Sequence, residues 1–240
     1  MNILLILAAI FPGLLICGVI YFLDRHEKEG PKPLLITFGL GMLSALPAVG
    51  IQMLAAKTGL DSSANFGFLL IYVFIVVAFS EELVKMGMLL AYPYPRPFFN
   101  EPMDGIVYSL MVGMGFAVVE NIIYAYNYGI DTIIVRAFTA VPAHAIFAVF
   151  MGYFVGLAKF NTTNKWKLIG FGFTLAVLIH GIYDFFILQQ YYDWLMGFGL
   201  VTIIIGSYLA WLLIKDHRAN SPFKVTVETE RVAGKEGEDL

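Results

Sequence analysis

The sequence predicts an all-α fold, a polytopic transmembrane helix bundle of about seven spans. Apolar residues make up 59% of the 240 positions and charged residues only 14%, whereas a typical soluble domain is about 45–50% apolar and 25% charged. Seven separate stretches are also long enough to cross a bilayer, because a membrane-spanning helix needs roughly 20 apolar residues. Short polar or proline-rich segments separate these stretches.

The predicted spans follow one another closely along the chain. They cover residues 3–23, 34–56, 67–92, 105–128, 132–158, 167–190 and 195–214. The first has no basic segment before it, so we expect a retained span and not a secretory signal peptide. The third to sixth spans are interrupted by ionisable side chains. We expect a membrane domain over 1–214 and a charged, mobile cytoplasmic tail over 215–240.

Basic residues are distributed unevenly between alternate loops. One set of loops, with the tail, holds Arg25, Lys28, Lys32, Arg96, Lys159, Lys165, Lys167, Lys215, Arg218, Lys224, Arg231 and Lys235. The other set holds at most Lys57 and Arg136. Because loops rich in lysine and arginine stay in the cytoplasm, we expect the N-terminus outside and the C-terminus in the cytoplasm.

Charge and cysteine content limit the classes of partner. The net charge is −3, whereas nucleic-acid binders usually carry a clustered basic face. The single cysteine, Cys17, excludes an internal disulfide. We therefore expect lipid as the surrounding medium and no nucleic-acid partner.

Seven of the ionisable side chains inside the predicted spans lie away from the span ends. They are Glu81, Glu82, Lys85, Glu120, His144, His180 and Asp184. An isolated acidic or basic group at the bilayer centre costs about 2.5–3.5 kcal/mol, and a protein stable by only about 5–15 kcal/mol cannot carry several of them unpaired. We therefore expect these side chains to face one another in the bundle interior or in a wet cavity.

The spacing of these residues supports one shared site. Lys85 follows Glu81 and Glu82 by four and three residues, so all three share a helix face, as do His180 and Asp184. Counting helix rise from the outer ends places Glu81, Glu120 and both histidines about 10–20 Å deep. Each feature alone has a simpler structural explanation, such as an ion pair or a packing histidine. Four such explanations at one depth are less economical than one site.

Two features of the fifth span concern packing. Gly152 and Gly156 form a small-xxx-small pattern that predicts a close helix approach. Pro142 lies two residues before His144 and either shapes the site or kinks a long helix.

Paired carboxylates beside histidines suit the activation of water. One glutamate would take the proton as general base, and the histidines would bind a metal or donate hydrogen bonds to a developing oxyanion. The chain contains neither His-Glu-x-x-His nor Gly-x-Ser-x-Gly, so the common signatures of soluble hydrolases are absent.

Four motifs occur in order along the chain. They are Glu81-Glu82-Leu83-Val84-Lys85, Phe116-x-x-x-Glu120-Asn121, His144-Ala145 and His180-x-x-x-Asp184. Together they resemble the PrsW family of bacterial membrane proteases, a branch of the superfamily that includes the CAAX prenyl proteases. The resemblance extends to residues 104–108 and 180–185 and covers nearly all of the chain except the tail. CAAX proteases usually carry EExxxR and Phe-x-x-x-His, so Lys85 and Glu120 favour the PrsW branch.

The resemblance implies an intramembrane endopeptidase of the bacterial cell membrane. It further implies site-1 cleavage of a single-span anti-sigma factor near its extracytoplasmic side, in regulated intramembrane proteolysis. The expected catalytic residues are Glu81, Glu82, Glu120, His144 and His180, with Lys85, Asp184 and Asn121 in support. Which of the two adjacent glutamates is the base stays open.

Three alternatives remain at this point. The first concerns the histidines: either His144 and His180 bind zinc together with Glu82 or Glu120, or they donate hydrogen bonds in a metal-free glutamate mechanism. Of these two, we favour the zinc site. An ion-coupled transporter would also bury such groups, although we find no inverted repeat. A non-catalytic scaffold or receptor would keep the bundle and tolerate loss of Glu81 and Glu82.

Overall fold

The computed structural model describes residues 3–59 and 65–224, and every regular element in these ranges is helical. The elements are α1 (Ile3–Leu23), α2 (Pro31–Ala56), α3 (Phe66–Ile71), the π-helix η1 (Tyr72–Phe79), α4 (Ser80–Ala91), α5 (Pro102–Tyr128), α6 (Ile130–Phe138), α7 (Ala140–Phe160), α8 (Lys165–Leu188), the 3₁₀-helix η2 (Asp193–Leu195) and α9 (Met196–Ala219). The predicted all-α fold is therefore confirmed.

Seven stretches of helix are long and apolar enough to cross a membrane, as predicted. The single helices α1, α2, α5 and α8 each form one span, and α3–η1–α4, α6–α7 and η2–α9 form three composite spans. α9 continues past the predicted end of the membrane domain to Ala219. Residues 225–240 of the predicted tail lie outside the described residues, and the division into 1–214 and 215–240 stays a prediction.

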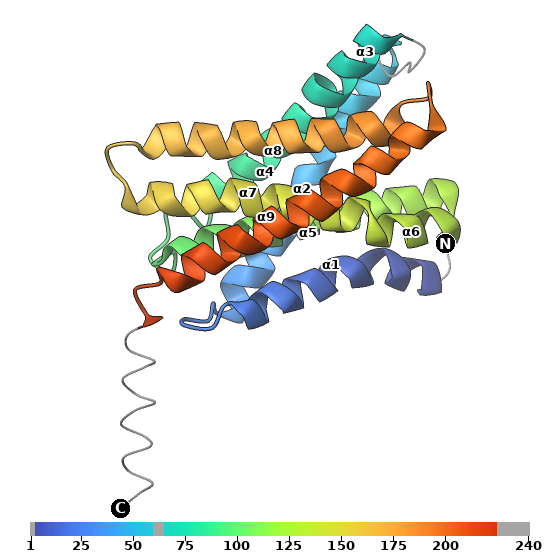
Figure 1. Cartoon of the computed structure of the whole chain (residues 1–240). Coiled ribbons are helices and arrows are strands. Elements are labelled where there is room, and N and C mark those ends of the chain that lie inside the picture. The colour runs from blue at the N-terminus through green and yellow to red at the C-terminus, as the bar shows by residue number, and fades with distance from the viewer. Residues whose placement is uncertain (1–2, 60–64, 225–240) are drawn as a thin grey trace, which may run out of the picture.

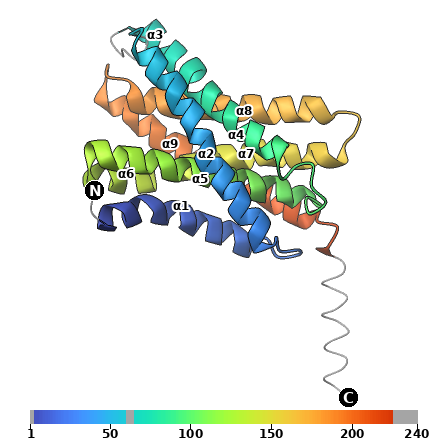
Figure 2. The same ribbon diagram turned by 180° about the vertical axis from the view of Figure 1, so that it is seen from behind.

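The central helix of the bundle is α5. Its most apolar window is 78% buried, against 22% for α1 and for α9, and it packs against α1, α2 and α7. α2 and the composite span α3–η1–α4 run together and cross the other helices obliquely (Figure 1, Figure 2). The peripheral helices expose large apolar side chains such as Phe22 and Leu35, each 71% exposed. A surface of this kind suits contact with lipid tails.

Glycines let α5 approach its neighbours at backbone distance. A Cβ atom added at Gly105 would lie 2.6 Å from Gly156 Cα and would also overlap the carbonyl of Gly152. The close approach predicted at Gly152 and Gly156 is therefore confirmed, with α5 as the partner of α7. Gly41 has the same role between α2 and α5, where an added Cβ would overlap the Val112 carbonyl.

The fifth span, predicted over 132–158, is observed over Ile130–Phe160 and is broken into two helices. α6 ends at Phe138 and α7 begins at Ala140, and Thr139 between them has non-helical dihedral angles of φ −123° and ψ −76°. Pro142 therefore lies in the first turn of α7, where a proline interrupts no helical hydrogen bond. Because Pro142 has no N–H to donate to the carbonyl of Phe138, a break at Thr139 agrees with the interpretation of Pro142 as a kink in a long helix. The break gives α6 its own direction, and α6 packs against both α5 and α7.

Candidate active site

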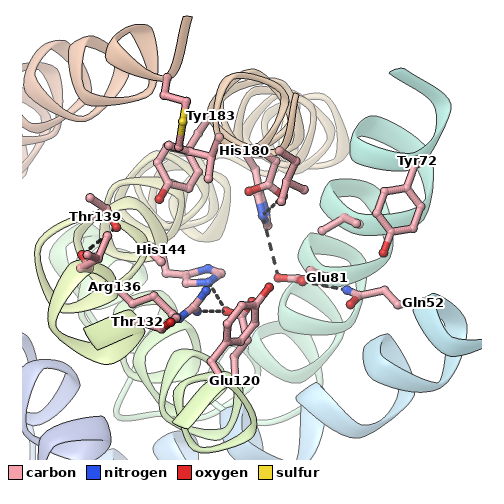
Figure 3. Close-up of a pocket in the computed structure, with 18 of the residues that line it drawn as sticks. Gln52, Tyr72, Glu81, Glu120, Thr132, Arg136, Thr139, His144, His180 and Tyr183 are labelled. Carbon is pink, nitrogen blue, oxygen red and sulfur yellow. Dashed lines mark hydrogen bonds and ion pairs between the residues drawn. The ribbon is translucent and has the colours of Figure 1, made fainter. Parts of the chain in front are cut away.

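Four helices bring the sequence-predicted side chains to one place inside the bundle. α4 carries Glu81 and Glu82, α5 carries Glu120, α7 carries His144 and α8 carries His180. The ring centroids of the two histidines are only 5.5 Å apart, and Figure 3 shows both histidines converging with Glu81 and Glu120. Apart from Glu120, whose side chain is 20% exposed, all are at most 5% exposed. The predicted convergence of the buried ionisable residues is therefore observed.

The glutamate pair lies at the start of α4, directly after the π-helix η1. π-Helical turns are rare and occur often at functional sites. Ser80, at the junction, donates its hydroxyl hydrogen to the carbonyls of Val76 and Val77. One turn later, Lys85 Nζ lies 3.2 Å from Glu81 Oε2 and 2.8 Å from Glu82 Oε1. A single lysine thus pairs with both carboxylates, as the i+4 and i+3 spacing predicted.

His144 connects this cluster to α5. Its Nδ1 lies 3.2 Å from Lys85 Nζ and its Nε2 lies 2.8 Å from Glu120 Oε2. Because an ammonium group only donates hydrogen bonds, Nδ1 must accept and Nε2–H must donate to Glu120. His144 is therefore a neutral imidazole in one defined tautomer. The Phe116 ring, whose centroid is 4.1 Å from Lys85 Nζ, closes another side of the ammonium group.

His180 is fixed between two carboxylates. Its Nδ1 lies 2.9 Å from Glu82 Oε1, and its Nε2 lies 3.2 Å from Asp184 Oδ2 and 3.9 Å from Glu81 Oε2. The Phe147 ring stacks on the imidazole with centroids 4.5 Å apart and an interplanar angle of 16°. Both ring nitrogens therefore face carboxylate oxygens, and a ring that donates from both nitrogens fits these contacts.

Arg136 and Gln52 also belong to the site, although the sequence interpretation assigned them no role in it. Arg136 Nη2 lies 2.8 Å from Glu120 Oε2, and its Nε donates to Asn121 Oδ1 at 2.8 Å. Gln52 of α2 donates from Nε2 to Glu81 Oε1 at 2.9 Å. Arg136 was counted as a loop charge although it falls within the predicted span 132–158. Its position inside a span was the sequence feature that could have indicated a role in the site. Gln52, an uncharged residue in an apolar helix, gave none.

Asn121, expected in a supporting role, does not touch the glutamate pair. Its Nδ2 donates to the Ala9 carbonyl of α1 at 3.2 Å while its Oδ1 accepts from Arg136. Through these two bonds Asn121 ties α1 to the arginine that holds Glu120.

A cavity of about 680 Å³ reaches the site from one end of the bundle. Glu81, Glu120, His144, His180 and Asp184 are among the side chains that line it, whereas Glu82 and Lys85 are not. The rest of the lining extends through α6 to the connection between α8 and α9, and includes Asp131, Thr132, Gln190 and Met196. The adjacent glutamates therefore differ: Glu81 faces the cavity and Glu82 lies behind it.

The cluster also contains a set of atoms suited to a metal ion. Glu81, Glu82 and His144 each offer one ligand atom, and these atoms all lie within 4.8 Å of one another. Carboxylate oxygen and imidazole nitrogen are ligands that zinc takes in catalytic sites. In the structure these groups surround Lys85 Nζ. A metal ion and the ammonium group would therefore compete for the same position.

Comparison with known proteins agrees with the motifs and the geometry. A family model described as PrsW family intramembrane metalloprotease matches residues 29–214. Three similar proteins are named Protease PrsW. The one from Geobacillus kaustophilus is 34% identical over 200 residues, which cover 83% of this chain and 87% of the relative. Those from Bacillus subtilis and Clostridioides difficile are 33% identical over 192 residues (80% of this chain, 85% of the relative) and 31% identical over 223 residues (90% of each). No solved structure matches the chain. With most of its length matched by the family model and by these relatives, the chain belongs to the PrsW family of intramembrane metalloproteases.

Proposed function

We propose that this membrane protease makes the first cut in a single-span anti-sigma factor, at the extracytoplasmic end of the substrate's span. The observation that carries the proposal is the cavity, which joins the Glu81 carboxylate to the end of the bundle that holds the α8–α9 connection. Loop charges predict that this end faces the outside. The anti-sigma factor as substrate class follows from the family resemblance.

The position of Arg136 strengthens the predicted orientation. Arg136 was one of only two basic residues assigned to the outer loops, and its side chain is engaged inside the site with Glu120 and Asn121. Lys57 is then the one basic residue of the outer set in the described part of the chain. The bias of lysine and arginine toward the opposite end becomes larger, which favours the N-terminus outside and the C-terminus in the cytoplasm.

In this proposal Glu81 is the general base and Glu82 is a positioning residue. Glu81 lines the cavity, where a water molecule and a substrate carbonyl have access, and Gln52 and Lys85 hold its two oxygens. Glu82 lies behind the cavity wall and binds Lys85 and His180. A base must lie within hydrogen-bond reach of the proton that it removes, and the cavity-facing carboxylate satisfies that condition.

His180 is the residue proposed to stabilise the oxyanion, by turning its Nε2–H, which is on the cavity side, from Asp184 to the substrate oxygen. His144 is proposed to stay in a fixed orientation beside it. Both histidines line the cavity, and donors already oriented in a site of low polarity stabilise developing charge effectively. Glu120 and Arg136 fix His144, while Asp184 and Phe147 fix His180. The substrate helix must unwind locally, because its carbonyls otherwise stay in the helical hydrogen-bond ladder.

A zinc ion fits the donor set formed by Glu81, Glu82 and His144, provided that Lys85 withdraws from the centre of that set. Glu81 would then hold the metal with one oxygen and would serve as base only through its other oxygen. A bound metal of this kind would polarise the scissile carbonyl or acidify a water molecule. Both nitrogens of His180 face carboxylates, so His180 is not part of this donor set. A role for His180 as a ligand stays a prediction.

We expect purified active protein to contain about one zinc ion per chain, and chelation to remove the metal and the activity together. Elemental analysis before and after dialysis against a chelator measures the zinc content. Cleavage of a membrane substrate measures the activity. Glu82→Gln, which replaces one donor, should lower the zinc content even where activity is not assayed. Full activity without stoichiometric metal would contradict the metal version, and Lys85 would then be the cation of a metal-free glutamate site.

The substrate class is tested in cells. Deleting the gene should leave a single-span anti-sigma factor at full length under the stress that normally triggers its loss. The wild-type gene should restore processing, and a Glu81→Gln gene should not. If every anti-sigma factor of the organism is processed normally in the deletion strain, the substrate class is wrong, although the assignment to the protease family is unaffected.

A further inference from the structure

A second group of carboxylates lies at the other end of the bundle, away from the protease cavity. Asp24, Glu27 and Glu29 stand on the connection between α1 and α2, and Glu101 and Asp104 stand at the start of α5. Asp24, Glu29, Glu101 and Asp104 are at most 4% exposed, and Glu27 is half-buried. Five acidic side chains therefore meet where two connections of the bundle come together.

With all five ionised, each of these carboxylates keeps an oxygen without a hydrogen-bond partner, and Glu29 and Asp104 are close enough to bond each other when one of them is protonated. Asp104 Oδ2 accepts from the backbone N–H groups of Asn100 and Glu101 at 2.6 and 2.9 Å, which leaves Oδ1 unpaired and buried. Glu101 accepts from the Ser221 hydroxyl, and Glu29 accepts from the Tyr108 hydroxyl. The unpaired oxygens are Asp24 Oδ2, Glu27 Oε2, Glu29 Oε1, Glu101 Oε1 and Asp104 Oδ1. Buried polar atoms of this kind are rare in proteins and call for a partner.

Basic side chains do not supply that partner within residues 3–59 and 65–224. No ion pair in these ranges involves any of the five carboxylates. The nearby Lys28 places its Nζ over the ring of Tyr21, 4.3 Å from the centroid. Burial, together with repulsion from the other carboxylates, raises the pKa of Asp24 to about 7 and also raises the pKa of Glu101. The basic side chains around the cluster therefore form no direct ion pair with it in the described ranges.

We propose that this cluster binds a divalent cation that prefers oxygen ligands, Mg²⁺ or Ca²⁺, through Glu27, Glu101 and Asp104. Each of the three residues offers a carboxylate oxygen, and the three oxygens lie within 4.8 Å of one another. An all-oxygen donor set selects magnesium or calcium, whereas zinc prefers nitrogen and sulfur. Glu27 is the most accessible of the three, and it provides the route by which the ion enters.

The ion would join three parts of the chain that are distant in sequence. Glu27 belongs to the α1–α2 connection, Glu101 and Asp104 cap the N-terminus of α5, and Ser221 follows the end of α9 and binds Glu101. α5 is also the helix that carries Glu120 of the protease site. The proposed site is a brace that holds the central helix at its opposite end, and it does not depend on the substrate or mechanism proposed above.

The test uses the full chain, purified in detergent and stripped of metal with a chelator. Adding Mg²⁺ or Ca²⁺ separately at a hundredfold excess over the dissociation constant should raise Tm by about 5–10 °C. Glu27→Gln should abolish this gain and, without cation, should raise Tm slightly because one repelling charge is removed. The matched control is Asp216→Asn, which alters an exposed carboxylate of α9 that accepts hydrogen bonds from Tyr153 and Asn220. Whatever its Tm without cation, this variant should keep the full gain when cation is added. Equilibrium dialysis should find one bound ion per wild-type chain.

Other outcomes would contradict the site. Equal stabilisation of wild type and Glu27→Gln by Mg²⁺ or Ca²⁺ would assign the effect to another place on the molecule. Stabilisation by zinc alone would point to the nitrogen-containing set in the protease cavity. If neither Mg²⁺ nor Ca²⁺ binds and the stripped protein is stabilised only by lowering the pH, the carboxylates share protons and the proposal is wrong.

Discussion

Replacing Glu81 with glutamine is expected to slow cleavage of a membrane substrate by about 10²–10⁴-fold, the range typical for loss of a general base. Glutamine has nearly the same shape and keeps an oxygen that accepts the hydrogen bond from Gln52. The protein should therefore still fold and insert, and the loss should appear in the rate of the chemical step. Purified variants reconstituted with a single-span substrate give this rate directly.

The matched comparisons separate a chemical effect from a structural one. Glu82→Gln should also reduce cleavage, but it loosens Lys85 and His180 and should therefore lower Tm more than Glu81→Gln does. Asp216→Asn, which alters an exposed carboxylate that does not line the cavity, should leave the cleavage rate unchanged, and any change in its Tm reports the bonds that Asp216 accepts from Tyr153 and Asn220. Wild-type cleavage rates in Glu81→Gln would remove this residue from the mechanism.

Replacing Gly105 with valine is expected to destabilise the bundle by about 3 kcal/mol or more, beyond the usual range for overpacking. The added side chain would meet main-chain atoms of Gly152 and Gly156, which cannot rotate away as a side chain does. α5 and α7 would have to separate, and these helices carry Glu120 and His144. Thermal unfolding in detergent should show a Tm lower by about 6–12 °C.

The control for this variant is Gly170→Val in α8. Gly170 is also a helical glycine, but it is exposed and an added Cβ would meet no atom within 4 Å. Both substitutions change the helix propensity by the same amount. The difference between the Tm values of the two variants therefore measures the effect on the α5–α7 contact. Equal Tm values for the two would show that the close approach at Gly105 does not limit stability.

The number of spans and the convergence of the site were predictable because a lipid environment restricts the possible structures. Backbone groups in hydrocarbon must be satisfied within helices, so long apolar stretches such as 105–128 could be assigned directly. The same environment makes isolated charges costly, which required Glu120, His144 and the glutamate pair to meet although they lie on different helices. No knowledge of the packing was needed for either inference.

Other parts depended on packing directions that the sequence does not specify. Glu81 and Glu82 are adjacent and chemically identical, and only the position of the cavity distinguishes them. Arg136 was counted as a loop charge because it lies near the outer end of the span predicted over 132–158, and its contact with Glu120 depends on how α6 packs. The carboxylates near Glu101 lie outside the predicted spans, where acidic residues are ordinarily solvated, and nothing in their spacing indicated burial.

Membership of the PrsW family also decides between the alternatives left open by the residues alone. The chain is a peptide hydrolase and not an ion-coupled transporter or a non-catalytic receptor. Lys85 and Glu120, at which the chain departs from the CAAX-protease pattern, have defined contacts in the structure. Lys85 forms ion pairs with both glutamates, and Glu120 orients His144.

The position of the cut tests the account most directly, because it depends on the site, its depth and the orientation of the bundle together. The measurement is the identification of product termini by mass spectrometry, in cells that lack the protease of the second step. New termini should lie within the outer third of the substrate's span or just beyond it on the extracytoplasmic side, and should be absent with Glu81→Gln. Termini on the cytoplasmic side would contradict the proposed orientation or depth of the site, and unchanged termini with Glu81→Gln would contradict the site itself.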